Sequence, residues 1–492
     1  MKIFRRGLIS FGIFLLLQTP AATGQALLLK ISPDLLKASA SATESGKTLP
    51  VWVFFTDKGD SERTSLQSAL AEARRSLRPR SLQRRAKVRG ESNLVDYEDL
   101  PLSLAYMDQV RALVPRIRTV CRWLNAVSVE ISPDQLGTLA ALGFVAGLDV
   151  VRGFRRNEGD NLLSPEEGPT VTSRSPIYGP SLAQLSQIGI PALHHRGLSG
   201  RGVLVALLDV GFHKSHEIFR LANLVAEWDF VFGDGDVQQN PSDPNDYSDA
   251  HGTATWSLLG GFKYGQLIGP AFGADFLLAK TEDERSETPI EEDYWAAGIE
   301  WAESFGADVV SSSLGYTDWY QFKDMDGKTA VTTKAANRAT SLGVVVVNAA
   351  GNERGNAWGH IIAPADGFDV IAVGAVDASG KVASFSSPGP TFDGRIKPEV
   401  CAQGVNDWIA QNRKDGSDFY TSGAGTSYAT PLVAGTAALL LEAHPDWTEK
   451  QVRAALMSTG GNAASPNNDY GWGIVNGPAA ADTATKAPVK NR

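Results

Sequence analysis

From residue 188 onward, short runs of apolar residues alternate with longer stretches in which apolar residues recur every three or four positions. The short runs have the continuous apolar character of strands that are buried on both faces of a parallel sheet. They lie at residues 203–209, 274–280, 307–315, 344–352 and 369–376, and helical stretches lie at 253–260, 292–305, 329–342, 426–442 and 448–459. This alternation predicts an α/β fold with a doubly wound, mostly parallel sheet, in which functional groups gather at the carboxyl ends of the strands.

The first third of the chain has a different pattern. Three apolar, strand-like segments, at residues 49–57, 123–131 and 144–154, are separated by helical segments. Residues 61–90 are polar and helical in character and carry a block of eight basic residues, and a short helix capped by Ser132 precedes the last strand. This order predicts a small α+β domain.

Two further segments set the domain boundaries. The chain opens with Lys2, Arg5 and Arg6, followed by a short apolar run and small residues, which is the pattern of a secretory signal peptide. A polar segment rich in Pro, Gly and Glu separates the two folded parts, and we interpret it as an exposed linker that is easily cleaved rather than as a long surface loop. The predicted organisation is a signal peptide at 1–26, an α+β domain at 27–155, a linker with a processing site at 156–180 and an α/β domain at 181–492.

Composition excludes several classes of protein. The net charge of −9 disfavours a nucleic-acid partner, and no segment after the signal peptide is apolar enough to predict a membrane span. The two cysteines, Cys121 and Cys401, form neither a disulfide framework nor a metal cage, and they lie in different predicted domains. Basic residues exceed acidic ones by six up to residue 175, and acidic residues are in excess by fifteen after it. A basic front part is consistent with a segment that docks onto an acidic body.

Candidate chemistry lies at the predicted strand ends. Asp209 ends the first apolar run of the α/β domain, and Asn352 follows the fourth. His251 lies in a short glycine-bounded segment, and Ser427 opens the apolar helix after a Gly-rich turn, with Thr426 as the predicted N-cap. A nucleophilic serine needs a base, a group that orients the base, and donors for the oxyanion. His251, Asp209 and Asn352 can supply these three functions, although each residue alone could also serve only in a cap or a solvated loop.

The sequence blocks around these residues resemble those of the subtilases, the subtilisin-like serine peptidases. The blocks are VALLDVG at Asp209, HGT at His251, AAGN at Asn352 and GTSYATP at Ser427, and they occur in the Asp, His, Ser order of subtilisin. The resemblance covers about residues 180–480, and residues 49–155 resemble the inhibitory propeptide of the family more loosely. Two positions depart from the usual blocks: Val210 stands where the family has Thr or Ser, and Ala254 stands in place of a second His.

The resemblance implies an exported serine endopeptidase that works through an acyl-enzyme intermediate. In that mechanism Asp209, His251 and Ser427 form the triad, and Asn352 with the Ser427 N–H binds the oxyanion. The expected substrate-binding edges are Ser313, Leu314 and Gly315 on one side and Ala349, Ala350 and Gly351 on the other. The expected partners are protein or peptide substrates and the chain's own propeptide, which is cut from a precursor; we expect a monomer that contacts neither nucleic acid nor, after signal removal, a membrane.

We expect no required cofactor and assign no metal ligand. His213 and His216 lie close after Asp209, but a catalytic metal site needs a third well-placed ligand. The acidic loop at 233–249 could hold calcium, which prefers carboxylate and carbonyl oxygens, but its spacing is not that of a known calcium loop. Calcium binding therefore stays a possibility for which the sequence locates no site.

Two other functions compete with this hypothesis. The chain could be a non-catalytic binding module on a subtilase scaffold, although all four site residues are intact. It could also be an exported esterase or lipase, but the G-x-S-x-G turn typical of those enzymes is absent around Ser427, and the order of the triad residues differs.

Overall fold

The computed structural model describes residues 27–59, 65–152, 175–238, 249–283, 292–413 and 416–484. They form two compact units. The described residues of Met1–Ser76 and Val95–Val151 make up the N-terminal unit, and Leu77–Leu94 together with Arg152–Arg492 make up the α/β unit. The predicted signal peptide and most of the predicted linker lie outside the described residues.

The N-terminal unit contains a four-stranded antiparallel sheet in the order β2-β3-β1-β4. The strands are β1 (Leu49–Phe55), β2 (Arg116–Cys121), β3 (Ala126–Ile131) and β4 (Val145–Val150), and the helices are α2 (Pro33–Ser45), α3 (Leu66–Ser76), α5 (Leu104–Arg111) and α6 (Leu136–Ala140). Alternate strand residues such as Val51, Val53, Val127 and Val129 point into one apolar core. The α+β architecture is therefore as predicted, but β2 was missed because its polar, half-exposed residues hide the strand pattern.

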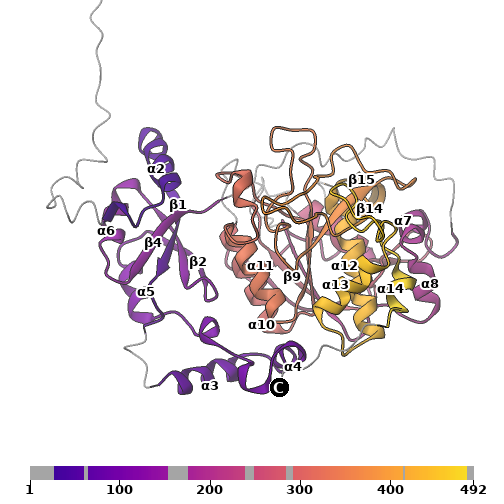
Figure 1. Ribbon diagram of the computed structural model, residues 1–492, viewed down its shortest axis with the longest axis horizontal. Helices are drawn as coiled ribbons and strands as arrows, with labels where there is room; N and C mark the ends of the chain where they lie inside the picture. Colours follow the sequence, from indigo (N-terminus) through magenta and orange to yellow (C-terminus); the bar gives the residue numbers. More distant parts are fainter. Residues whose placement is uncertain are drawn as a thin grey trace, which may run out of the picture. The chain divides into compact units, whose positions relative to one another are not determined.

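The α/β unit is built on a seven-stranded parallel sheet in the order β13-β12-β11-β10-β5-β9-β6 (Figure 1). The strands are β5 (Leu204–Asp209), β6 (Asn223–Asp229), β9 (Asp275–Lys280), β10 (Val309–Ser312), β11 (Val345–Ala349), β12 (Ile371–Val376) and β13 (Val400–Gln403). From β5 the chain passes to β6 at one edge of the sheet and returns to β9, which lies between β6 and β5. It then crosses to the other side of β5 and builds outward from β10 to β13. The winding reverses between β5 and β10, which is where α/β sheets usually bind ligands.

Helices cover both faces of this sheet, so the predicted doubly wound fold is confirmed. They are α9 (Asp249–Gly260), α10 (Glu292–Phe305), α11 (Val331–Ser341), α12 (Thr426–Ala443) and α13 (Glu449–Ser458). Helices α9 and α12 pack on each other and on the sheet, whereas α10 and α11 form a second pair on the opposite face (Figure 1). Shorter elements complete the unit: α7 (Leu182–Gln187), α8 (Ile190–His195), α14 (Gly477–Ala481), the hairpin of β14 (Val405–Asn412) and β15 (Asp418–Ala424), and the pair β7 (Phe262–Lys263) and β8 (Leu267–Ile268).

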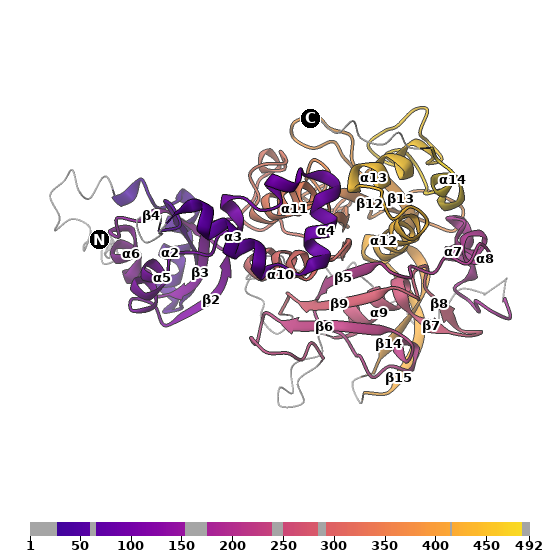
Figure 2. The same ribbon diagram turned by 90° about the horizontal axis from the view of Figure 1, so that it is seen from below.

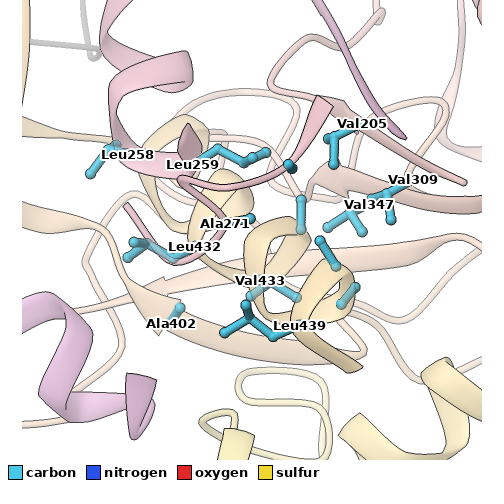
Figure 3. Packing of buried hydrophobic residues seen from close by; sticks show 14 of the residues in the cluster. Val205, Leu258, Leu259, Ala271, Val309, Val347, Ala402, Leu432, Val433 and Leu439 are labelled. Carbon is cyan, nitrogen blue, oxygen red and sulfur yellow. The ribbon is translucent and has the colours of Figure 1, made fainter. Parts of the chain in front are cut away.

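The core of the α/β unit lies between the sheet and α12. Figure 3 shows Val205, Val309 and Val347 of three adjacent strands in the same apolar cluster as Leu432 and Val433 of the helix, and all five are buried. Burying each such side chain is worth roughly 1.5–3 kcal/mol. Because this core fixes α12 against the strands, it also fixes where the N-terminus of the helix meets the strand ends. Among the described helices, none combines the length and apolar character that a membrane crossing requires.

The polar stretch at 61–90 forms two helices, where the sequence suggested one continuous helical segment. Helix α3 ends at Ser76, and α4 (Pro79–Val88) starts with Pro79 at its first position, where a missing N–H costs nothing. Helix α4 belongs to the α/β unit and packs against α10, as both overall views show (Figures 1 and 2). Its residues Arg84 and Arg85 are buried and bind Glu303 of α10. Part of the basic block is therefore a buried contact and not a solvated surface.

Candidate active site

The strand β5 delivers Asp209 to the carboxyl edge of the sheet, and α9 brings His251 to it. The helix begins at Asp249, four residues before the predicted start, so His251 lies in its first turn rather than in a loop. His251 Nδ1 lies 2.7 Å from Asp209 Oδ1, and both residues are buried. The backbone N–H of Val210 donates to the same carboxylate oxygen at 2.8 Å.

A glycine makes this close approach possible. A Cβ atom on Gly252 would lie 1.9 Å from the carbonyl oxygen of Gly211, far inside van der Waals contact. Any other residue would push α9 away from the loop that follows Asp209. The glycine of the HGT block thus has a packing reason that the sequence alone does not reveal.

The Asp209 carboxylate also contacts the hydroxyl of Thr255, a residue that the sequence pattern did not single out. Thr255 Oγ1 lies 2.9 Å from Asp209 Oδ2, so the second oxygen of the carboxylate also has a donor. Thr255 follows His251 by four positions on α9, and residues at this spacing lie on one face of a helix. That spacing is the signal that could have identified Thr255.

Ser427 lies in the first turn of α12, but the predicted cap is wrong. Gly425 is the N-cap and makes no side-chain cap, whereas Thr426 is the first helical residue. The first N–H groups of a helix have no partner within the helix, so the Ser427 N–H is placed to serve as an external donor. Burial of Ser427 is nearly complete, with 3% of the residue exposed.

Pro431 ties Ser427 to the end of β10. In a regular helix the N–H of residue 431 would donate to the carbonyl of residue 427, but proline has no N–H. Ser313 Oγ takes its place and donates to the Ser427 carbonyl at 2.8 Å. The Ser427 hydroxyl in turn lies 3.2 Å from the Ser313 carbonyl. The proline inside the helix therefore creates the acceptor that connects helix and strand.

The second link of the predicted triad, between His251 and Ser427, is not formed in this structure. The His251 ring lies 6.0 Å, between centroids, from the ring of Tyr428, the residue after Ser427. His251 Nε2 is buried and has no hydrogen-bond partner among the described residues, while the Ser427 hydroxyl is oriented to Ser313. In enzymes without substrate such contacts are often long and tighten only in the complex. The structure thus joins Asp209 to His251 directly, and the Ser427–His251 pair stays a prediction.

Asn352 meets α12 at the same place. It follows β11, and its side-chain Oδ1 accepts hydrogen bonds from the backbone N and the Oγ1 of Thr426, at 2.9 and 3.0 Å. Because Thr426, the residue before Ser427, holds this oxygen, the Asn352 amide is fixed at the N-terminus of α12. Its Nδ2 is a donor, which is the chemical type that an oxyanion requires.

The two expected substrate-binding edges differ in the hydrogen bonds that their backbone groups already make within the chain. At the first, the Leu314 carbonyl accepts from Asn348 Nδ2 at 2.9 Å, and a Cβ on Gly315 would lie 2.1 Å from Ile362 Cδ1. At the second, the Ala350 N–H already donates to the Val373 carbonyl. Ala349 is the last residue of β11 and is paired with Val373 in the sheet, and Gly351 has a φ of +108°, which favours glycine. A peptide that adds along this edge therefore cannot use the Ala350 N–H.

No metal centre is seen in the part of the chain that the structure describes. There, no group of three or more His, Cys, Asp or Glu side chains could hold an ion. His213 lies 3.6 Å from Asp249 Oδ2 and 3.5 Å from Asp418 Oδ1, and these two carboxylates, Asp249 above all, raise the pKa of the imidazole. Most of the loop considered for calcium, residues 239–248, lies outside the described residues. Cys121 and Cys401 are both buried, and they are not joined to each other by a disulfide.

Comparison with known proteins places two segments of the chain in one family. Residues 200–473 match the model of the subtilase family, and residues 50–162 match that of the peptidase S8 propeptide domain of Bacteroidota. The first match spans the sheet, Asp209, His251 and Ser427, and the second spans most of the N-terminal unit together with α4.

Individual relatives agree with these matches. The chain is 36% identical over 305 residues to subtilisin E of Bacillus subtilis (strain 168), covering 60% of this chain and 70% of that one. It is 34% identical over 358 residues to an alkaline protease of Alkalihalobacillus alcalophilus, covering 73% and 79%. Its fold resembles that of fervidolysin from Fervidobacterium pennivorans, described as a keratinolytic enzyme related to subtilisin, with a TM-score of 0.61 and 21% identity. That alignment covers 90% of this chain and 62% of fervidolysin, so at this identity the likeness concerns the fold alone.

Proposed function

The chain belongs to the subtilase family and is a serine endopeptidase, and on that premise we propose that Asp209, His251 and Ser427 are its catalytic triad. The observation that carries the proposal is the 2.7 Å contact between His251 Nδ1 and Asp209 Oδ1. This contact fixes the ring with Nε2 as the nitrogen that can accept a proton, and Nε2 has no partner within the described residues.

In the proposed reaction, His251 Nε2 takes the proton of Ser427 as the hydroxyl attacks the scissile carbonyl. Asp209 holds the imidazole in the required tautomer and stabilises its cation. His251 then gives the proton to the leaving amine, and an acyl-enzyme forms on Ser427. Water hydrolyses the acyl-enzyme, again with His251 as the base.

The negative charge of the tetrahedral intermediate falls on the substrate oxygen. We assign its two donors as Asn352 Nδ2 and the Ser427 N–H. The bonds of Thr426 to Asn352 Oδ1 support this assignment, because they hold the amide before the reaction starts. The helix N-terminus adds a favourable dipole at the same place.

The enzyme is proposed to be made as a precursor and exported. Residues 1–26 would direct export, and cleavage within 156–180 would separate residues 27–155, which act as the inhibitory propeptide, from the catalytic domain at 181–492. The propeptide-domain match at residues 50–162 supports this order. The substrate would lie extended between Ser313–Gly315 and Ala349–Gly351, bound chiefly through backbone groups, and the mature enzyme would act as a monomer.

The proposal is tested by digesting casein with the purified protein and with a Ser427→Ala variant. Hydrolysis by the first and not by the second, together with labelling of Ser427 by a fluorophosphonate, is the expected result. Labelling of another residue, or undiminished hydrolysis by the variant, would exclude this triad. N-terminal sequencing of the mature protein tests processing, and a first residue outside 156–180 would contradict the precursor scheme.

A further inference from the structure

The carboxylate of Asp209 has a separate side-chain donor on each oxygen. Oδ1 lies 2.7 Å from His251 Nδ1 and 2.8 Å from the Val210 N–H, whereas Oδ2 lies 2.9 Å from Thr255 Oγ1. Among the described residues, Thr255 provides the one hydrogen bond seen to Oδ2. Asp209 is 1% exposed, so water does not readily replace a missing donor.

Both side-chain donors come from one face of one helix. His251 and Thr255 are four residues apart on α9, and this spacing places them one turn apart above the end of β5. A carboxylate held at a single oxygen can still turn about its Cβ–Cγ bond. A donor on each oxygen fixes the carboxylate plane relative to the imidazole ring, and this orientation determines how well Asp209 holds Nδ1–H.

The Thr255 hydroxyl has a second acceptor within reach. Its oxygen lies 3.0 Å from the Gly252 carbonyl, the helix acceptor that buried Ser and Thr side chains commonly use. A hydroxyl has one proton, and a hydrogen bond to an ionised carboxylate is about twice as strong as one to a neutral carbonyl. The proton therefore goes to Asp209, and the contact to Gly252 limits the rotation of the side chain.

The sequence adds a reason for a donor from the helix. At position 210, directly after the aspartate, this chain has valine, an apolar residue. Val210 contributes its backbone N–H to Asp209 but has no hydroxyl. Thr255, which lies on α9, instead provides a hydroxyl that donates to the Asp209 carboxylate.

We propose that Thr255 is a positioning residue of the peptidase reaction, which orients Asp209 by donating to Oδ2 and acts through Asp209 on His251. This proposal rests on the triad proposed above. Thr255 contacts neither the substrate nor the reacting atoms, so its loss slows the chemical steps and leaves peptide binding unchanged. The conservative Thr255→Ser variant keeps the hydroxyl, whereas Thr255→Val keeps the shape and removes it.

The test measures kcat and KM on a peptide substrate, together with the rate of fluorophosphonate labelling of Ser427. We expect Thr255→Val to lower kcat and the labelling rate by about ten- to a hundredfold, the effect of losing one hydrogen bond to a charged group. KM should stay within about twofold of wild type, and Thr255→Ser should keep kcat within about threefold. Thr436→Val is the matched control, because Thr436 is also a buried helix threonine but donates only to its own helix, at Leu432 O.

A wild-type kcat for Thr255→Val, or an equal loss for Thr255→Ser, would overturn the proposal. An inactive wild-type protein would instead overturn the proposed function. If Thr255→Val fails to mature, the Ser427→Ala precursor carries the test, because it needs no activity. There the downfield NMR signal of the His251 Nδ1 proton should move on Thr255→Val and stay on Thr436→Val; an unmoved signal in Thr255→Val would contradict the positioning role.

Discussion

Two buried carboxylates of the α/β unit, Asp209 at the strand edge and Glu303 on α10, have opposite kinds of partner. Glu303 binds Arg85 through both oxygens, at 2.8 and 2.7 Å, and also accepts from Arg84 and from Ser81 Oγ. Among the described residues, the donors to Asp209 are a backbone N–H, a threonine hydroxyl and an imidazole, none of which carries a permanent charge.

The difference decides what each site can do. Burial by itself would raise the pKa of Glu303, but the charge of Arg84 and the hydrogen bonds and charge of Arg85 outweigh it, and the pKa falls to about 2. Arginine keeps its proton, so the Glu303 contact has no proton to exchange. The imidazole beside Asp209 can gain one, and its Nε2 has no partner in the described structure. The permanently charged arginines make a fixed contact between α4 and α10. The imidazole beside Asp209 can instead take up a proton at Nε2, as a catalytic base must.

The largest expected effect comes from removing the charge at the strand edge. Asp209→Asn keeps the shape but offers an amide in place of the carboxylate, so the ring can adopt the wrong tautomer. We expect kcat to fall by about 10⁴-fold with little change in melting temperature. Steady-state kinetics on a peptide substrate measures it, and a loss below tenfold would show that Asp209 does not orient His251.

The matching change at the second carboxylate should affect stability rather than chemistry. Glu303→Ala leaves Arg84 and Arg85 buried without a counter-charge, and breaking such a pair costs about 3–5 kcal/mol. Urea unfolding of the full chain, with Ser427→Ala to prevent processing, measures this loss. Gln83→Ala is the control on the exposed side of the same helix, where we expect a change within about 0.5 kcal/mol. Equal effects of the two variants would contradict a structural role for the buried pair.

A smaller loss of activity is expected at the oxyanion donor. Asn352→Ala removes Nδ2 while Ser427 and His251 stay in place, and the corresponding loss in subtilisin is about 10²–10³ in kcat. KM should change little, because the donor acts on charge that develops only in the transition state. Kinetics over a range of substrate concentrations separates the two parameters. Full activity of this variant would remove Asn352 from the site.

The smallest predicted effect concerns acid stability. The pKa of Glu303 lies at about 2 in the folded chain, against its ordinary value of 4.5, so the fold favours the ionised form. The contribution of the Glu303 carboxylate to the free energy of unfolding is complete above about pH 4.5. It disappears as the pH falls through about 2, because Glu303 is then protonated in both the folded and the unfolded chain. The shift corresponds to about 3 kcal/mol. Unfolding of the Ser427→Ala protein and of its Glu303→Gln derivative should therefore converge between pH 4.5 and 2, and a constant difference would refute the lowered pKa.

Elements whose pattern is local could be predicted from the amino-acid sequence. The apolar runs at 203–209 and 344–352 became β5 and β11, because a strand buried on both faces must be apolar throughout. The order of Asp209, His251 and Ser427 along the chain indicated the family, which the comparisons confirm. Strand β6 was missed because it lies at the edge of the sheet, where polar residues are tolerated.

The contacts between polar groups that are distant in the sequence could not be predicted in this way, because they depend on how whole elements pack. The bond of Ser313 to the Ser427 carbonyl depends on an acceptor that Pro431 leaves open, and the donation of Thr255 to Asp209 depends on how closely α9 approaches β5. The pairing of Arg85 with Glu303 joins positions 218 residues apart. Such contacts are selected by the packing of whole elements, and no pattern within one segment encodes them, because a polar side chain has many partners within reach until the fold removes all but a few.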